Sequence, residues 1–420
     1  MKIRLFLRAV LQLAAPLSII RFALAAGSLV DTWFAGQIGP DALAGVALGN
    51  LILGLIPGSL VYVASAAQIM IPAADHARRR RLVAATIVVA VVMEFVSMIL
   101  VGLLTIPGVL EALGQRPGQI AHAIPYLWAM LLAAIPIGVF AAMRFCLTSL
   151  GRPQVATAWT LLGCVLNFVF NGLFALGWFG FPPLGTFGIG LSSAAVYTVL
   201  SAGLLWRLAR DPQLGIARPI VQDIRAITVQ GLPIALTVIL EIGQFTIAGL
   251  MVGATGVLAA HQVVSELNYF LFMVPSSAGQ AVGVIVAQRR ARKRTAVRAA
   301  IVLCLIYAFA VNALVQPNPS GLVRLFTADD VVVMQAIPLM RLVGGMAVFD
   351  AGQIIFTGIL RGCGDTGSPL KISALGYLFG SVAGFVLAFG LHFGAPGVWM
   401  GLATGLVLAT VGLYRRCTIT

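Results

Sequence analysis

Four acidic residues lie deep within long apolar stretches of this chain: Asp31, Glu94, Glu241 and Asp350. Moving an ionised carboxylate into hydrocarbon costs several kcal/mol even on lenient scales. An acid that is kept in such a place commonly binds an ion, a proton or a substrate. We therefore interpret these acids as candidate sites for small cations, and the functional argument begins with them.

Asp31 lies in the first apolar stretch, and two asparagines from a later stretch are its expected partners. Asn167 and Asn171 are four residues apart, so they share one face of a helix. Their neutral amides can hold a carboxylate by hydrogen bonds without fixing its charge. We predict that Asp31 takes up a proton or a sodium ion beside Asn167 and Asn171. The alternative is an aspartate that caps a helix break near Gly36 and Gly39.

The second half of the chain contributes two acids, each followed by a glutamine at helical spacing. Glu241 has no basic residue within a turn, which favours its protonated form, and Gln244 follows on the same face. Gln353 lies one turn after Asp350. Hard cations prefer oxygen ligands, so Glu241 and Asp350 are the candidate sodium site. The sequence leaves open whether either acid instead makes a structural contact.

The structural alternatives are different for each acid. Glu241 could make an interhelical hydrogen bond, and Asp350 could pair with Arg341 or Arg361 from another helix. For Glu94 and Glu266 the alternative is a buried, satisfied polar pair; His261 is five residues before Glu266. We expect Arg21 to neutralise one of the acids, and the sequence does not say which.

Further side chains are candidates for binding a flat organic cation through charge or aromatic faces. The predicted substrate ligands are Gln244, Glu266, Tyr269, Phe270 and Gln353. Phe34, Met70, Phe245 and Met273 could also line such a site, or could pack in the core. Pro16 frees a backbone carbonyl within the first stretch, and we predict a hinge there that responds to Asp31.

The elements that must position these residues are membrane-spanning helices. Of the 420 residues, 60% are hydrophobic and only 10% are charged, whereas soluble domains carry roughly 25% charged residues. The stretches are continuously apolar rather than alternating, so helices are favoured over a β-barrel. At about 20 residues per crossing, the sequence predicts spans at 9–36, 44–74, 82–107, 120–147, 155–178, 186–208, 226–250, 257–288, 296–316, 331–360, 370–392 and 395–414.

The net charge of +14 is explained by the membrane rather than by nucleic acid. Basic residues follow alternate spans, and positive charge collects on the cytoplasmic side. Both termini are therefore predicted to be cytoplasmic, as an even number of spans requires. The basic residues of this side include Lys2, Arg4, Arg8, Arg78, Arg79, Arg80, Arg81, Arg207, Arg210, Arg218, Arg225, Arg289, Arg290, Arg292, Lys293, Arg294, Arg298, Arg415 and Arg416.

Motifs for catalysis or resident cofactors are missing from the sequence. The 5 cysteines show no paired spacing, and no HExxH, CxxC or P-loop pattern occurs. We therefore expect no enzyme activity and no cofactor other than a transported ion, Na⁺ or H⁺.

The sequence repeats weakly between its halves. APLSIIRFALAAGSLVDTWFAGQIGPDALA around Pro16 aligns with GLPIALTVILEIGQFTIAGLMVGATGVLAA around Pro233. The repeat predicts two six-helix bundles in one all-α membrane protein, related by a pseudo-two-fold axis along the membrane normal. The expected boundaries are 1–208 for the N-lobe, 209–225 for a cytoplasmic linker and 226–420 for the C-lobe. Such parallel repeats are typical of transporters that work by alternating access.

The segment VDTWFAGQIGPDALA resembles the multidrug and toxic compound extrusion (MATE) family, most closely its NorM-like bacterial branch. LNFVFN at 166–171, AHQ at 260–262 and LRGCGDT at 360–366 add to a resemblance that covers essentially the whole chain. It implies export of lipophilic organic cations in exchange for Na⁺ or H⁺. It also implies that the acids at Glu241, Asp350 and Asp31 fall on the family's acidic positions in helices 7, 10 and 1.

Three other functions are weighed against this one. A flippase for a lipid-linked glycan would need a basic cleft, which Arg21 and Arg341 leave open and the buried acids oppose. A membrane-embedded enzyme would need a nucleophile or metal cluster, and none is evident. A channel is disfavoured because the repeat favours alternating access.

Overall fold

The computed structural model describes residues 3–106, 108–210, 217–288 and 293–419. These residues contain 12 helices long and apolar enough to cross a membrane, and they contain no β-strand. The predicted all-α architecture and the number of spans are therefore confirmed. Of the predicted basic residues, Lys2, Arg289, Arg290 and Arg292 lie outside the described part of the chain, as does residue range 211–216 of the predicted linker.

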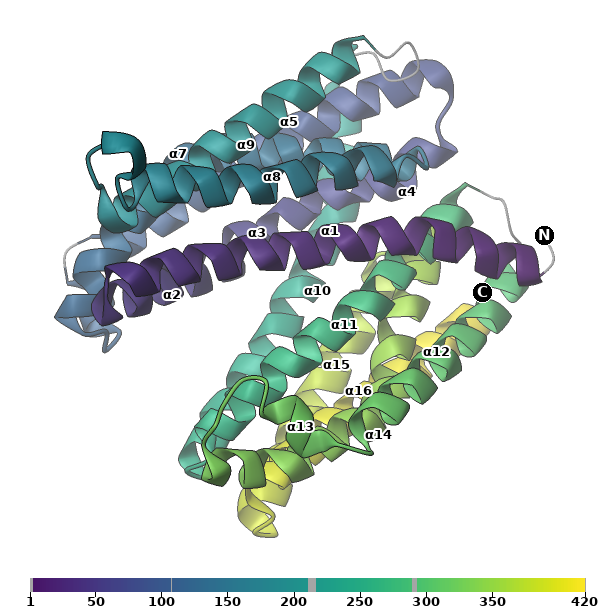
Figure 1. The fold of residues 1–420 in the computed structure, drawn as a ribbon. Coiled ribbons are helices and arrows are strands. Elements are labelled where there is room, and N and C mark those ends of the chain that lie inside the picture. The colour runs from purple at the N-terminus through teal and green to yellow at the C-terminus, as the bar shows by residue number, and fades with distance from the viewer. Residues whose placement is uncertain (1–2, 107, 211–216, 289–292, 420) are drawn as a thin grey trace. The chain divides into compact units, whose positions relative to one another are not determined.

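The first half of the chain forms its spans from α1 through α9 (Figure 1). The elements are α1 (Ile3–Ile38), α2 (Pro40–Leu55), α3 (Pro57–Leu60), η1 (Val61–Ala66), α4 (Ala67–Ala73), α5 (His76–Leu104), α6 (Val109–Ala112), α7 (Pro117–Ser149), α8 (Pro153–Phe174), η2 (Trp178–Gly180) and α9 (Gly185–Ala209).

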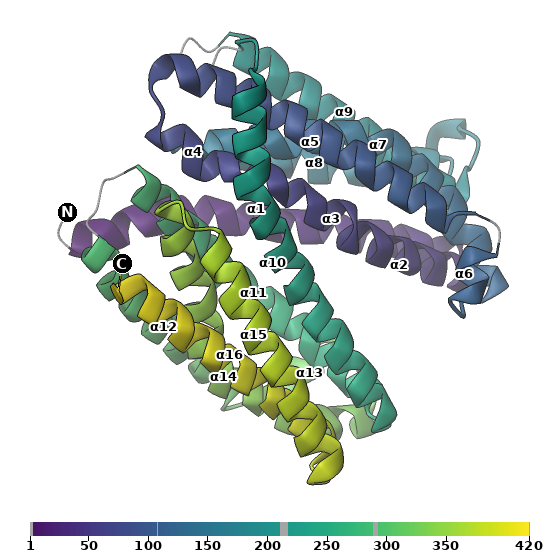
Figure 2. The same ribbon diagram turned by 180° about the vertical axis from the view of Figure 1, so that it is seen from behind.

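The second half forms its spans from α10 through α16 (Figure 2). The elements are α10 (Val221–Ala254), α11 (Leu258–Ala287), α12 (Lys293–Val315), α13 (Pro319–Val323), α14 (Asp330–Gly362), α15 (Gly367–Phe385), η3 (Val386–Gly390) and α16 (Gly394–Ile419). Because α10 begins at Val221, the last residues of the predicted linker are helical.

The chain divides into two compact units. The N-terminal unit comprises 19–235, and the C-terminal unit comprises 1–18 together with 236–420. Both α1 and α10 continue from one unit into the other.

The second span, predicted at 44–74, is interrupted at Pro57, one of the prolines that we expect to allow bends. The α-helix α2 ends at Leu55, a short helix follows from Pro57, and 61–66 form a tighter 3₁₀ segment. Proline has no N–H to donate to the preceding turn, which accounts for the break at Pro57. The bend brings Tyr62 of η1 beside Phe145 of α7, with ring centroids 6.0 Å apart.

Glycines allow the closest helix contacts of the C-terminal unit. Along α15 and α16, a Cβ built on Gly401 would lie 2.6 Å from the carbonyl oxygen of Gly380. A Cβ on Gly405 would lie 2.7 Å from the carbonyl oxygen of Gly376. Both helices carry these glycines four residues apart, the small-residue spacing that lets membrane helices approach closely. Figure 2 shows α15 and α16 running side by side.

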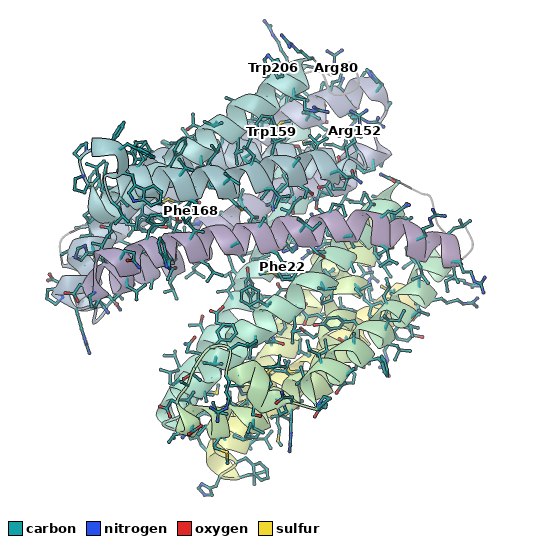
Figure 3. The ribbon with its side chains drawn as sticks, viewed as in Figure 1. Phe22, Arg80, Arg152, Trp159, Phe168 and Trp206 are labelled. Atoms are coloured by element: carbon teal, nitrogen blue, oxygen red, sulfur yellow. The ribbon has the colours of Figure 1, made fainter. Side chains whose placement is uncertain are left out.

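In the N-terminal unit, α7 is the central element and packs against α2, α5 and α9. Its contacts also depend on glycine: a Cβ on Gly190 of α9 would lie 2.6 Å from the Cβ of Ala129. Trp159 of α8 lies directly over Gly203 of α9, where a side chain would collide with the indole. Figure 3 shows Trp159 on α8 near the end of the unit that also holds Arg152 and Trp206.

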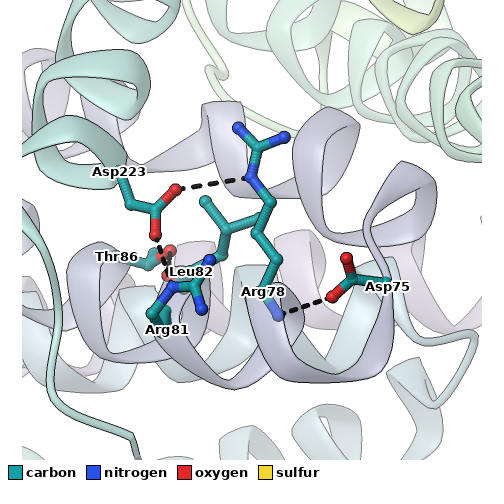
Figure 4. Close-up of polar contacts among 6 residues, drawn as sticks. All are labelled: Asp75, Arg78, Arg81, Leu82, Thr86 and Asp223. Atoms are coloured by element: carbon teal, nitrogen blue, oxygen red, sulfur yellow. Dashed lines mark hydrogen bonds and ion pairs between the residues drawn. The ribbon is translucent and has the colours of Figure 1, made fainter.

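An ion-pair cluster ties the start of α10 to the basic sequence that opens α5 (Figure 4). Asp223 accepts hydrogen bonds from Nε of Arg78 at 3.4 Å and Nε of Arg81 at 3.2 Å. The side chain of Asp223 is only 4% exposed, whereas both arginines are more accessible. Asp75 caps α5 by accepting the backbone N–H of Arg78 at 2.8 Å.

We predict that Asp223→Asn lowers the melting temperature of the purified protein. The substitution keeps the shape of the side chain but removes the charge that two guanidinium groups contact. Because the arginines are partly exposed and screened, the loss should be about 1 kcal/mol. The matched control is Asp330→Asn, which removes the exposed Arg324–Asp330 pair, and it should leave the melting temperature unchanged. Equal shifts in the two variants would contradict a special role for the Asp223 cluster.

The turn between α14 and α15 is fixed by Asp365. Partial burial opposes ionisation of this carboxyl, but the pKa of Asp365 lies below its usual value because the backbone and side chain of Ser368 and the guanidinium of Arg416 donate hydrogen bonds to it. The Nη2 atom of Arg416 lies 3.0 Å from Oδ2 of Asp365. This pair links the α14–α15 turn to the last turns of α16.

Candidate functional site

The N-terminal unit holds Asp31 in a set of polar side chains from α8 and α9. The Nδ2 atoms of Asn167 and Asn171 donate to Oδ1 of Asp31 at 3.0 Å and 2.7 Å. The hydroxyl of Ser193 donates more weakly to Oδ2, at 3.5 Å. Asp31 is 6% exposed and belongs to a continuous α1 that runs on to Ile38. It therefore does not cap a helix break, and the alternative that we considered for it is wrong.

This polar set leaves acceptor atoms available around the carboxylate. The Oδ1 atom of Asn171 is buried and accepts no hydrogen bond from the described residues. Asn171 also donates to Oδ1 of Asn167 at 3.3 Å. Buried acceptors without donors are uncommon in proteins and call for a partner such as water or an ion. The arrangement thus offers a carboxylate and nearby amide oxygens to a small cation, or a carboxylate to a proton.

Aromatic side chains pack beside this polar set. Phe168 of α8, labelled in Figure 3, stacks on Trp33 with ring centroids 6.2 Å apart and meets Phe34 edge-on at 5.4 Å. Trp178 packs against both phenylalanines, at 5.8 Å in each case. Phe34 is fully buried, so it is a core residue rather than a pocket residue.

The C-terminal unit brings its two acids together. Asp350 of α14 and Glu241 of α10 interact electrostatically, and Asp350 is 7% exposed. Gln353 links the pair to α15: its Nε2 donates to Oε1 of Glu241 at 3.4 Å and contacts the hydroxyl of the buried Tyr377. Tyr307 of α12 also lies in electrostatic range of Asp350.

No basic residue of the described chain forms an ion pair with Asp350. Arg341 is exposed, and its backbone carbonyl accepts a hydrogen bond from Gln316 at 3.2 Å. The expected alternative, a pair of Asp350 with Arg341 or Arg361, is therefore wrong. Among the described residues, the carboxylate of Asp350 has Glu241 as its electrostatic neighbour and no hydrogen-bond donor, while Oε1 of Gln353 is buried without a donor. These oxygens and Glu241 are the C-terminal candidate for cation binding.

The other predicted substrate ligands are dispersed. Gln244 is buried on α10, whereas Glu266 of α11 is exposed and its carboxylate has no described partner. His261 instead faces Ser265 at 3.4 Å and packs against Trp399, so a buried Glu266–His261 pair does not form. Tyr269 is 56% exposed and packs edge-on against Phe270, with centroids 6.3 Å apart.

Glu94 of α5 is fully buried, with 0% of its surface exposed. Both of its carboxylate oxygens lack a hydrogen-bond partner among the described residues. The satisfied polar pair that we considered for this residue is therefore wrong.

Pro16, the predicted hinge, lies inside α1.

Sequence reasoning missed several polar members of these sites. Ser193, Tyr197 and Tyr377 each lie within an apolar helix, and none has a distinctive local signal. Arg144 of α7 was also missed: its guanidinium lies 5.2 Å from the ring of Phe145, and its buried Nε has no described acceptor. Its position in an apolar stretch, AAMRFCL, is the sequence signal that marks it as exceptional.

Comparisons with known proteins identify the family of this chain. A model of the MatE family matches residues 16–173 and 233–386. The chain belongs to the MatE family. The family model matches twice, and the two matches begin at Pro16 and Pro233, the pair of prolines that the internal repeat aligns. The repeat seen in the sequence therefore corresponds to two copies of the family's unit.

Similar MatE proteins cover nearly the whole chain. A "Probable multidrug resistance protein NorM" of Pseudomonas putida is 32% identical, over 97% of this chain and 93% of its own length. A protein of the same name from Synechococcus is also 32% identical, over 99% and 94%. A crystal structure of a mutant of the Vibrio cholerae MATE transporter VcmN superposes with a TM-score of 0.90 at 18% identity, over 99% of this chain and 97% of that one.

Proposed function

We propose that this protein is a cation-coupled antiporter, which exports lipophilic organic cations while Na⁺ or H⁺ enters. Membership of the MatE family and relatives named multidrug resistance proteins support export of organic compounds. The observation that carries the coupling is the Glu241–Asp350 pair, in which Asp350 has neither a basic partner nor a hydrogen-bond donor among the described residues. A pair of acids so placed attracts whichever cation is present.

Competition for these charges couples the two fluxes in our proposal. An organic cation binds where the carboxylates are ionised. Protonation of Asp31, Glu241 or Asp350, or sodium binding to them, removes the negative charge that held it. A ligand shifts a conformational equilibrium only by its differential affinity for the two states, so binding of the small cation favours the state that has released the large one. The driving force is adequate, at about 2.3 kcal/mol per charge for each 100 mV.

The predicted substrate ligands differ in how well they suit this role. Gln353 donates a hydrogen bond to Glu241, so among the predicted substrate ligands it is the one that lies beside the acid pair. Glu266 and Tyr269 are exposed on α11 and remain candidates for an initial contact with substrate.

Pro16 remains our candidate hinge in α1. We expect a monomer in the bacterial plasma membrane with both termini in the cytoplasm, because the basic sequences then face the cytoplasm.

The flippase alternative would need cations to hold a pyrophosphate. Arg144 and Arg21 lie in electrostatic range of one another in the N-terminal unit, which is the observation in favour of that alternative. The same unit contains Asp31 and Glu94, and carboxylates near the site would repel a pyrophosphate. Export of cations is therefore the function that the charges support best.

Ethidium efflux from membrane vesicles tests the proposal. Vesicles carrying the protein should lose ethidium under an imposed sodium or proton gradient directed opposite to the drug flux, and the gradient that works identifies the coupling ion. Vesicles without the protein are the control. Efflux that is equally fast with no gradient would rule out antiport.

A further inference from the structure

We propose that Glu94 of α5 binds and releases a proton during the transport cycle, as a second protonatable carboxyl of the N-terminal unit besides Asp31. The inference rests on the ion-coupled export proposed above and assigns one of its proton sites. The carboxylate would take a proton from hydronium, leaving water, and return it to water in the opposite step. No redox change or co-reactant is involved.

The packing around Glu94 is built to enclose the side chain. Gly138 of α7 faces it: a Cβ at that position would lie 2.8 Å from Cγ of Glu94 and 3.1 Å from the carbonyl oxygen of Ala90. Any larger residue at Gly138 would therefore displace the acid. The chain thus leaves space on α7 for a carboxyl-bearing side chain, next to an apolar cluster that contains Ala90 of α5 and Ala141, Ala142 and Phe145 of α7.

A proton is the cation that fits this enclosure. Glu94 is fully buried and neither oxygen has a described partner, so an ionised carboxylate would have no compensation for its lost hydration. The neutral acid avoids that penalty. A sodium ion would require several oxygen ligands, and among the described residues no polar side chain makes a hydrogen bond with the carboxyl group of Glu94. The conformation described here is therefore the one in which Glu94 carries the proton.

The charged and titratable neighbours of Glu94 come from few elements. Of the elements packed against α5, η1 contributes Tyr62, and the adjoining part of α7 contributes Arg144 and Cys146. The short helices α3 and α4 contribute none. From α9, Tyr197 lies in electrostatic range of Glu94, Arg144 and Asp31. Tyr197 is thus the neighbour that the two acids share.

Arg144 is the candidate counter-charge for the ionised form, because it lies on α7, the helix that faces Glu94 through Gly138. Its Nε atom is buried and has no hydrogen-bond acceptor among the described residues. A buried carboxyl without a described donor and a half-buried guanidinium whose Nε lacks a described acceptor thus lie on two helices that pack together, α5 and α7. If the contact at Gly138 loosens and admits water, Glu94 can ionise with Arg144 as the nearest cation on the facing helix. Deprotonation is therefore tied to a change in helix packing.

Infrared spectroscopy tests whether the proton is present. At pH about 7, solvent-exposed glutamates are ionised, so a protonated carboxyl band remaining there belongs to buried acids. The band should lose intensity in Glu94→Gln and keep it in Glu111→Gln, a matched change at an exposed acid on α6. An unchanged band in Glu94→Gln would overturn the inference. Because the amide preserves size and neutrality, Glu94→Gln should also fold and melt like the parent.

Transport then tests whether the proton moves. With Glu94→Gln in vesicles, proton-driven ethidium efflux should fall by about tenfold, equivalent to about 1.4 kcal/mol. Ethidium binding to the purified variant should stay within about twofold of the parent, and Glu94→Asp should restore part of the efflux. Parental efflux in Glu94→Gln would make the acid a static core residue and overturn the inference. If the parent protein itself exported ethidium equally fast with no gradient, the proposed antiport would fail, whereas parental gradient-driven efflux in Glu94→Gln would overturn only this inference, so the two failures are distinguishable.

Discussion

The variant Asp31→Asn should lose gradient-driven ethidium efflux, with an initial rate at least about tenfold below that of the parent. The Oδ1 atom of Asp31 receives two amide donors at 3.0 Å and 2.7 Å. An asparagine can accept these two hydrogen bonds through its carbonyl oxygen, but it can neither take up a proton nor neutralise a cation. Ethidium efflux from vesicles under separate sodium and proton gradients is the measurement. Protein abundance and melting temperature must be compared in parallel, because the new amide nitrogen takes the place of the Oδ2 atom to which Ser193 donates.

Ser193→Ala is the matched control for Asp31→Asn. It removes a marginal hydrogen bond to Oδ2, 3.5 Å long, and leaves the carboxylate and both asparagines in place. Its efflux should remain within about threefold of the parent, since a neutral hydrogen bond contributes about 1 kcal/mol or less. Gradient-driven efflux at the parental rate in Asp31→Asn would remove Asp31 from the coupling mechanism.

Length and apolar composition were sufficient to predict the architecture. Lipid leaves no water to satisfy the backbone, so a continuously apolar stretch of about 20 residues must be helical. The same argument identified Asp31, Glu94, Glu241 and Asp350 as exceptional, because each places an ionisable carboxyl group where hydration is lost. The four-residue spacing of Asn167 and Asn171 correctly placed both side chains on one face toward a common acid.

The partners of these acids were harder to predict because they come from distant segments. Ser193 and Tyr377 are hydroxyl-bearing residues in helices whose every face is apolar, and a helix that is apolar all round does not reveal which face points inward. The same ambiguity made Phe34 a candidate for a pocket, although it packs in the core. Glu94 shows a different limit: the sequence located the acid, but only tertiary packing shows that its carboxyl oxygens have no hydrogen-bond partner in the described part of the chain.

The two acid clusters offer different chemistry to a small cation. In the N-terminal unit, amide and hydroxyl groups donate hydrogen bonds to Asp31. These hydrogen bonds stabilise the ionised carboxylate before a cation binds. In the C-terminal unit, Asp350 has a second acid as neighbour and no described donor. Two carboxylates that share a site repel each other until one proton or metal ion joins them. The Glu241–Asp350 pair should therefore respond as one site.

The variants Glu241→Gln and Asp350→Asn should each weaken ethidium binding by about tenfold and reduce gradient-driven efflux at least as much. Removing either acid leaves the other without its partner for a shared cation. The isosteric control is Tyr377→Phe, which removes the hydroxyl next to Gln353 while both carboxylates remain. It should bind ethidium with an affinity within about threefold of the parent, because only a neutral group is lost. Binding to purified protein and efflux from vesicles are measured on the same preparations.

The double variant decides whether the two acids act together. Residues that share one ligand give non-additive effects in a double-mutant cycle, with interaction energies of about 0.5–3 kcal/mol. The binding loss in Glu241→Gln/Asp350→Asn should therefore be much smaller than the product of the two single losses, because the first substitution already destroys the shared site. A double loss equal to that product would mean two independent carboxylates, and competition between drug and coupling ion would then have to occur at each acid separately.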